Sequence, residues 1–175
     1  MRKQISNIIS WLIVLWIAKV FLLSLPYKFS GHPDTQHIFG TIGLWMKETL
    51  GHSIGNGFIQ YGAYTVGTVE LIISLILLAP ALIWLIQKNS THIKLPSQHT
   101  LHGLGGLMAA GVMCGAVFFH LATPLGIEVL HKGKSDNGSL FYAAVSIIFL
   151  GATLSFISYS RWTASSVSQS SVQLE

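Results

Sequence analysis

The hydrophobic residues of this chain gather into four long runs that are separated by polar segments. Each run is apolar over about 20 residues or more, the length that an α-helix needs to cross a hydrocarbon core of about 30 Å. A strand of a membrane barrel would instead alternate apolar and polar residues over about ten positions. Because helices satisfy their own backbone hydrogen bonds in lipid, the pattern predicts an all-α, four-helix transmembrane bundle. The predicted spans are residues 6–26, 58–86, 104–127 and 140–160.

The connection between the first two spans, residues 28–57, is too long for a simple turn. It mixes polar residues with apolar ones such as Ile38 and Trp45, a composition typical of a helix that lies in the membrane interface. Pro33 would fit the first turn of such a helix, whereas two glycines within the segment weaken the helical interpretation. The alternative is a loop that covers the end of the bundle, and the pattern favours neither.

The four spans are expected to form one domain, residues 1–162. The first run is similar to the apolar part of a signal peptide, but it is longer, and Pro26, Tyr27 and Lys28 offer no small-residue cleavage site. We therefore expect a retained membrane anchor. Residues 163–175 are rich in serine and too poor in apolar residues to pack, so they are predicted to form a disordered polar tail.

The composition agrees with a membrane protein, since 51% of the residues are hydrophobic and only 9% are charged. Soluble proteins carry about 25% charged residues. The formal net charge of +4 arises from basic residues that are scattered over the termini and connections. Nucleic-acid binding would require these residues to form a stripe with interleaved aromatics. The lipid bilayer is therefore the expected partner, and nucleic acid is not.

The basic residues also predict an orientation, because cytoplasmic loops carry an excess of lysine and arginine. An even number of spans places both termini on one side. The residues expected on that side are Arg2, Lys3, Lys88, Lys94 and Arg161. Those expected on the other side are Lys28, Lys47, Lys132 and Lys134. This small excess predicts that both termini are cytoplasmic and that the loops around His37 and His131 lie outside.

Motifs for several chemistries are missing from the sequence. Cys114 is the only cysteine, which excludes an internal disulfide, a Cys-x-x-Cys redox pair and a thiolate zinc site within one chain. His92, His99 and His102 follow the second span but have no carboxylate or thiolate nearby, so we interpret them as solvated loop histidines and predict no metal site. Hydrolase, nucleotidase and metalloprotease motifs have no counterpart here.

Several short stretches show a likeness to a known family. They are residues 26–33 (Pro-Tyr-Lys-Phe-Ser-Gly-His-Pro) with Phe39 and Gly43, residues 66–71 (Val-Gly-Thr-Val-Glu-Leu) before an apolar run to Pro80, and residues 136–141 (Asp-Asn-Gly-Ser-Leu-Phe). Together they resemble the DoxX-like family of small four-helix membrane proteins, over residues 16–160. The resemblance implies a four-helix bundle. In some relatives it also implies a small subunit linked to quinone-coupled oxidation, or to the assembly and maturation of other proteins.

Three ionisable residues fall within the predicted spans: Lys19, Glu70 and His120. A charge at the centre of a membrane costs at least about 2.5 kcal/mol and normally faces a partner or a cavity. If these residues do not meet, the Lys19 side chain would extend to the membrane interface, and His120 would make a hydrogen bond between helices. Because the three lie at similar depth on three different spans, we predict that they converge into one polar cluster in the outer half of the bundle.

Smaller residues of the spans suggest a cavity lining and a packing surface. Gly111 and Gly115 form a Gly-x-x-x-Gly pair, which permits the close approach of another helix. The glycine-rich third span is thus a candidate contact with another membrane protein or with a second copy of the chain. The candidates for cavity lining are Gly67, Ser74, Tyr142 and Ser146.

These features lead to a first hypothesis, a non-catalytic subunit or assembly factor of a bacterial inner-membrane complex. The alternative is a membrane subunit of a quinone-linked oxidoreductase, in which Glu70 or His120 exchanges a proton with a bound quinone cofactor. A transporter is the weakest interpretation, because the sequence shows neither inverted halves nor two interrupted spans at matching positions.

Overall fold

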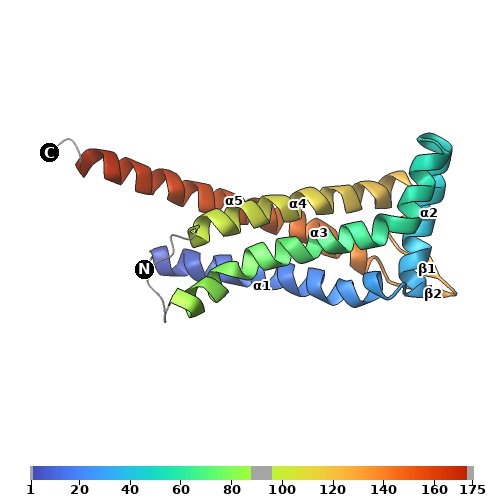
Figure 1. Cartoon of the computed structure of the whole chain (residues 1–175), viewed down its shortest axis with the longest axis horizontal. Helices are drawn as coiled ribbons and strands as arrows, with labels where there is room; N and C mark the ends of the chain where they lie inside the picture. The colour runs from blue at the N-terminus through green and yellow to red at the C-terminus, as the bar shows by residue number, and fades with distance from the viewer. Residues whose placement is uncertain (1, 88–95, 173–175) are drawn as a thin grey trace.

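The computed structural model describes the backbone of residues 2–87 and 96–172, with side chains for residues 4–85 and 96–161. Four long helices run side by side and form the bundle (Figure 1). They are α1 (Arg2–Phe29), α3 (His52–Gln87), α4 (Gln98–Ala122) and α5 (Ser139–Val172). Each contains a segment long and apolar enough to span a membrane. The predicted all-α, four-helix class is therefore confirmed.

The connection between the first two spans contains a helix, α2 (Pro33–Thr49), which lies across one end of the bundle (Figure 1). Pro33 occupies its first turn, and the Nδ1 atom of His32 accepts a hydrogen bond from the backbone N–H of Asp34. Close packing outweighs the poor helix propensity of glycine, because Gly43 and Gly55 bring α2 and the start of α3 into contact. The helical interpretation of this segment is confirmed.

Several element boundaries differ from the sequence prediction, among them the start of α3 and both ends of α4. α3 begins at His52, six positions before the predicted start at 58. α4 ends at Ala122 instead of continuing to 127, because Pro124 disfavours a helical conformation at Thr123, whose φ and ψ are −115° and 167°. A short antiparallel hairpin follows, formed by β1 (Leu130–His131) and β2 (Lys134–Ser135).

α5 continues as a helix to Val172, into the segment that was predicted to be disordered. Extending an existing helix is less costly than starting one, so a serine-rich sequence can follow on from a membrane span. Residues 173–175 of the predicted tail lie outside the described residues.

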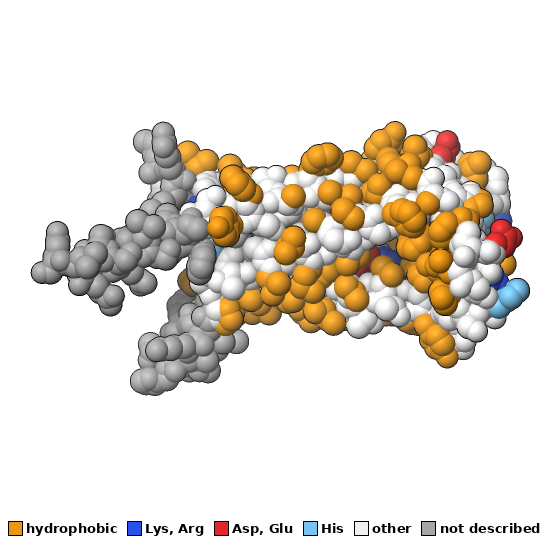
Figure 2. All heavy atoms as spheres, turned by 90° about the horizontal axis from the view of Figure 1, so that it is seen from above, with side chains coloured by type: hydrophobic (Ala, Val, Ile, Leu, Met, Phe, Trp, Pro, Cys, Tyr) orange, Lys and Arg blue, Asp and Glu red, His pale blue; other side chains and the backbone are white. Residues whose placement is uncertain are grey.

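The core runs along the centre of the bundle, where α1, α3, α4 and α5 each contribute fully buried side chains. Its largest members are Ile17, Phe21, Ile73, Leu77, Ile147 and Leu154. Many large apolar residues, such as Leu82, Phe149 and Phe156, are exposed instead on the outer surface, and Figure 2 shows hydrophobic side chains over much of one face. A surface of this kind is suited to lipid contact.

Glycine also governs the packing of α4 against α5, but at positions other than the predicted pair. A Cβ atom at Gly106 would lie 2.7 Å from the carbonyl oxygen of Gly151, and one at Gly151 would lie 2.5 Å from that of Gly106. In contrast, a Cβ atom at Gly111 or Gly115 would meet nothing within 4 Å. The expected close approach is therefore made by Gly106 and Gly151, which face each other across the helix pair.

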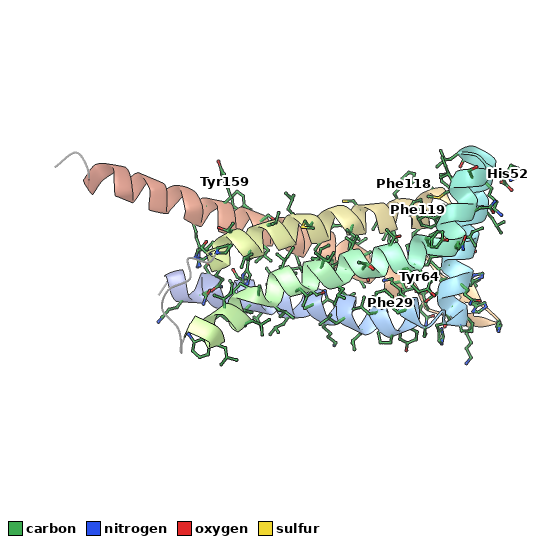
Figure 3. All side chains as sticks on the ribbon, viewed as in Figure 1. Phe29, His52, Tyr64, Phe118, Phe119 and Tyr159 are labelled. Atoms are coloured by element: carbon green, nitrogen blue, oxygen red, sulfur yellow. The ribbon has the colours of Figure 1, made fainter. Side chains whose placement is uncertain are left out.

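A second, smaller core closes one end of the bundle. Ile42 and Met46 of α2 pack with Leu125 and Val129 from the segment after α4. Phe58 of α3 and Phe119 of α4 pack against this group with their rings 5.6 Å apart, and Figure 3 shows Phe119 at the α2 end of the bundle. α2 and the hairpin segment thus form a cap over the helix ends.

Candidate ligand-binding cavity

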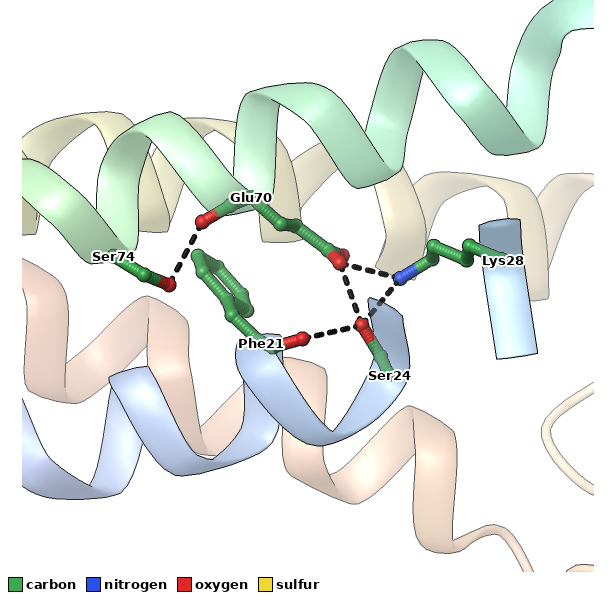
Figure 4. Close-up of polar contacts among 5 residues, drawn as sticks. All are labelled: Phe21, Ser24, Lys28, Glu70 and Ser74. Atoms are coloured by element: carbon green, nitrogen blue, oxygen red, sulfur yellow. Dashed lines mark hydrogen bonds and ion pairs between the residues drawn. The ribbon is translucent and has the colours of Figure 1, made fainter. Parts of the chain in front are cut away.

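A buried ion pair joins α1 to α3 (Figure 4). The Nζ atom of Lys28 lies 2.5 Å from the Oε2 atom of Glu70, and these side chains are only 15% and 3% exposed. Ser24 connects the two, because its hydroxyl accepts a hydrogen bond from Lys28 Nζ at 2.9 Å and lies 2.7 Å from Glu70 Oε2. The single hydroxyl proton of Ser24 serves either Glu70 or the Phe21 carbonyl, which is also 2.7 Å away.

The local sequence explains why this pair forms. Ser24 and Lys28 are four residues apart on α1 and therefore share one face of the helix. On α3, Gly67 lies one turn before Glu70, and a Cβ atom there would be 3.2 Å from the Phe29 ring and 3.4 Å from the Lys28 side chain. The absence of a side chain at Gly67 lets the end of α1 approach α3 closely and brings Lys28 next to Glu70.

Beside the ion pair lies a cavity of about 670 Å³. All five helices contribute to its wall, which is mostly apolar and includes Phe21, Ile42, Phe58 and Phe119. Lys28, Glu70 and His120 are among its polar lining residues. Figure 2 shows a hollow on one face of the molecule, with basic and acidic side chains visible inside it.

His120 contributes a second polar group to the cavity. It is 7% exposed, and its Nδ1 atom lies 2.7 Å from the carbonyl oxygen of Gly126. Because a carbonyl oxygen only accepts, Nδ1 carries a proton in this contact, and when the ring is neutral its Nε2 atom is an acceptor. The ring also meets Phe141 of α5 edge to face, at 5.7 Å between centroids.

Two aspartates lie where the cavity meets the cap. Asp34 of α2 lies 2.6 Å from Nδ1 of His131 in the hairpin, and this hydrogen bond is the main cause that lowers the pKa of the exposed Asp34 carboxyl. Burial of Asp136 raises its pKa, but hydrogen bonds from the backbone N–H groups of Leu140, Val129 and Gly138 outweigh that effect and lower it. Both aspartates are therefore held as carboxylates.

The structure does not bring Lys19 into the predicted cluster. Lys19 is exposed on α1, with Nζ 5.8 Å from the centre of the Trp16 ring. Five residues, or about 140° of helix rotation, separate it from Ser24, so the two point to different sides of α1. Glu70 and His120 do line one cavity, but the cation beside Glu70 is Lys28. The prediction was wrong for Lys19.

The predicted lining residues take other roles. Ser74 is fully buried and donates a hydrogen bond to the Glu70 carbonyl, and Gly67 is covered by the end of α1. Tyr142 is 62% exposed, and Ser146 accepts a hydrogen bond from the Trp16 indole at 3.0 Å. None of the four lines the cavity. Gly111 and Gly115, which were expected to pack against a helix, do line it.

Sequence reasoning missed Lys28 and Ser24. Pro26 was taken as the end of the first span, which placed Lys28 in a loop, yet α1 continues through Pro26 to Phe29. The available signal was the four-residue spacing of Ser24 and Lys28, which places the two side chains on the same face of a helix, about one turn apart. It pointed to a polar face near the end of the first span.

One predicted loop histidine is buried at the opposite end of the bundle. His102 lies on α4, is 1% exposed and meets the Trp11 ring edge to face at 4.9 Å. Neither ring nitrogen makes a hydrogen bond to any described residue, and the nearby backbone of Leu77 falls outside normal hydrogen-bond geometry. The loop interpretation was wrong for His102 and for His99, since both lie on α4. His99 lies on α4 near Arg161, and His92 is outside the described residues.

No family model matches the chain, and neither the curated proteins nor the solved structures contain a significant match. The geometry of the cavity and the motifs of the sequence are therefore the basis for a functional proposal.

Proposed function

We propose that this chain is a DoxX-like membrane subunit that binds a lipid-soluble molecule in the cavity and serves a membrane complex as an accessory or assembly component. The observation that carries this proposal is an apolar cavity of about 670 Å³ with a buried ion pair in its wall. Small-molecule sites commonly measure about 300–1,000 Å³ and combine apolar walls with a few placed polar groups. Helices that served packing alone would fill such a space with side chains.

The position of the cavity supports a ligand that arrives from the bilayer. Several of its lining residues are also exposed on the outer surface of the bundle, among them Leu23 of α1, Gly111 of α4 and Leu140 of α5. These helices contain the membrane-spanning segments, so their outer surfaces face lipid. A molecule dissolved in the bilayer therefore has a lateral route to the ion pair.

Filling the cavity tests this function. Gly115 lines the cavity, and a Cβ atom there meets nothing within 4 Å, so Gly115→Leu should occupy ligand space without disturbing the helices. Gly40→Leu is the matched control, because Gly40 is equally unobstructed but lies outside the cavity. Each protein is purified in mild detergent, and its bound lipids are extracted and identified. The proposal expects a bound molecule in the parent and control proteins that Gly115→Leu lacks, and its retention in Gly115→Leu would contradict the proposal.

A second candidate is a membrane subunit of a quinone-linked oxidoreductase. The observation that favours it is that Glu70 and His120, two groups able to exchange protons, line the same apolar cavity. In this case Glu70→Gln should abolish quinone turnover by the assembled complex while assembly remains measurable. If assembly is lost first, the accessory role is favoured, and a stoichiometric protein partner in the same purification would support it further.

The proposed location is a bacterial inner membrane with both termini in the cytoplasm, as the basic residues favour. The cap formed by α2 and the hairpin would then face outward. Single cysteines at Ser53, Ser90 and Ser135, in a Cys114→Ser background, test this orientation with an impermeant thiol reagent on intact cells. Labelling at Ser53 and Ser135 but not at Ser90 is expected, and the reverse pattern would invert the orientation.

A further inference from the structure

Two hydrogen-bond acceptors in the cavity wall have no partner among the described residues. Glu70 uses its Oε2 atom for both Ser24 and Lys28, which leaves its Oε1 atom without a donor. His120 uses Nδ1 for the Gly126 carbonyl, which leaves the acceptor Nε2. One side chain comes from α3 and the other from α4, so these unsatisfied acceptors reach the cavity from different helices.

Both atoms are open to the cavity. In the described part of the chain, the only fully enclosed polar side-chain atoms without a partner are the ring nitrogens of His102. Glu70 Oε1 and His120 Nε2 are therefore not sealed, although their residues are only 2% and 7% exposed. Because both residues line the cavity, these two atoms are exposed to the cavity. A donor from a bound molecule would satisfy acceptors that the protein itself leaves unpaired.

The charges around the cavity favour a neutral ligand. Lys28 and Glu70 compensate each other, so a charged head group would leave one charge without a partner in a poorly hydrated site. Asp34 and Asp136 also line the cavity and would repel an anion. The head group that fits is uncharged and carries donor hydrogens.

We propose that the cavity selects a neutral amphiphile whose head group donates hydrogen bonds, namely a phenol or alcohol on an apolar chain, and that Glu70 Oε1 and His120 Nε2 accept those bonds. This inference rests on the proposed function and specifies its ligand class. The apolar chain lies along Phe21, Phe58 and Phe119 and passes the open wall at Gly111 toward the lipid. Methylation of the hydroxyls, or their oxidation to carbonyls, removes the donors and weakens binding.

Two ligands that differ only by O-methylation test this selectivity. The first is a resorcinol that carries an undecyl chain, and the second is its dimethyl ether, which keeps the oxygens but has no donor hydrogen. Equilibrium binding of each to the full chain in lipid nanodiscs is measured by calorimetry. The resorcinol should bind at least about tenfold more tightly than the ether, as expected for hydrogen bonds to buried acceptors.

Two variants assign the selectivity to the named atoms. His120→Phe removes Nε2, and the double change Lys28→Met with Glu70→Leu removes Oε1 without leaving an unpaired charge. Each should lower the preference for the resorcinol severalfold while ether binding stays within about twofold, which also shows that the cavity still forms. Gly40→Leu, outside the cavity, should keep the full preference.

The outcomes separate the inference from the proposed function. If neither ligand binds, the proposed function fails. If both bind equally, or the ether binds more tightly, the cavity holds amphiphiles but the donor preference is overturned. If the preference exists but survives in both variants, Glu70 and His120 are not its source, and the assignment is overturned.

Discussion

Lys28, in the last turn of α1, contacts Glu70 in the middle of α3 at 2.5 Å, although 42 positions separate them in the sequence. Both charges are shielded from solvent, so each depends on the other. The contact fixes the end of α1 against α3, just below the cap. The ion pair between Lys28 and Glu70 therefore contributes both to the stability of the bundle and to the shape of the cavity.

The ion pair should show strong energetic coupling. Lys28→Met or Glu70→Leu alone strands one charge in a buried site and should lower the free energy of unfolding by about 3–5 kcal/mol. The double change should cost clearly less than the sum of the two, because it leaves no unpaired charge. Chemical unfolding in detergent micelles measures all three. Lys19→Met is the control, and this exposed lysine should change stability by less than about 1 kcal/mol. Additive losses would show that the pair is not coupled.

The contact between α4 and α5 should tolerate no side chain. In Gly151→Ala the new Cβ atom would meet the Gly106 carbonyl, so the helices must separate at a cost of about 1–3 kcal/mol. Gly111→Ala is the matched control, because nothing lies within 4 Å and alanine is the better helix former. The midpoint of thermal unfolding in detergent should fall for the first variant and stay or rise for the second. Equal effects would contradict the observed packing.

The contact between Asp34 and His131 should stabilise the cap at neutral pH and fail in acid. The folded-state pKa of Asp34 is lowered from 3.8, so its contribution is present above that unfolded value and is lost as the pH falls through the lower folded value. In His131→Gln the pKa of Asp34 should rise toward 3.8. Nuclear magnetic resonance titration of the Asp34 carboxyl carbon measures the change. An unaltered titration curve would show that His131 is not the cause.

The buried imidazole of His102 should be replaceable. Neither ring nitrogen has a hydrogen bond to a described residue, so His102→Leu removes unsatisfied polar atoms from the core and should leave stability unchanged or raise it by about 1 kcal/mol. His120→Leu is the comparison, because it removes the bond to the Gly126 carbonyl and should be destabilising by about 1–3 kcal/mol. A large loss in His102→Leu, measured by thermal unfolding, would reveal a partner of this ring outside the described residues.

The sequence by itself determined the four spans, because a lipid core requires long apolar helices and their length is visible in the chain. It also indicated a local signal at a helix start, Pro33 at the beginning of α2. These features depend on residues close together in the chain, so no tertiary contact is needed to recognise them.

Tertiary structure alone decided which faces of the helices meet. In a soluble bundle the apolar face of each helix indicates its inner side, but here the side toward lipid is apolar as well. The rotation of each helix about its axis therefore leaves little trace in the hydrophobic pattern. Without that rotation, the sequence could not show that Lys28 rather than Lys19 pairs with Glu70, or that Gly106 rather than Gly111 is the packing position. Close packing of backbone at Gly67, Gly106 and Gly151 sets these rotations, and with them the ion pair and the cavity.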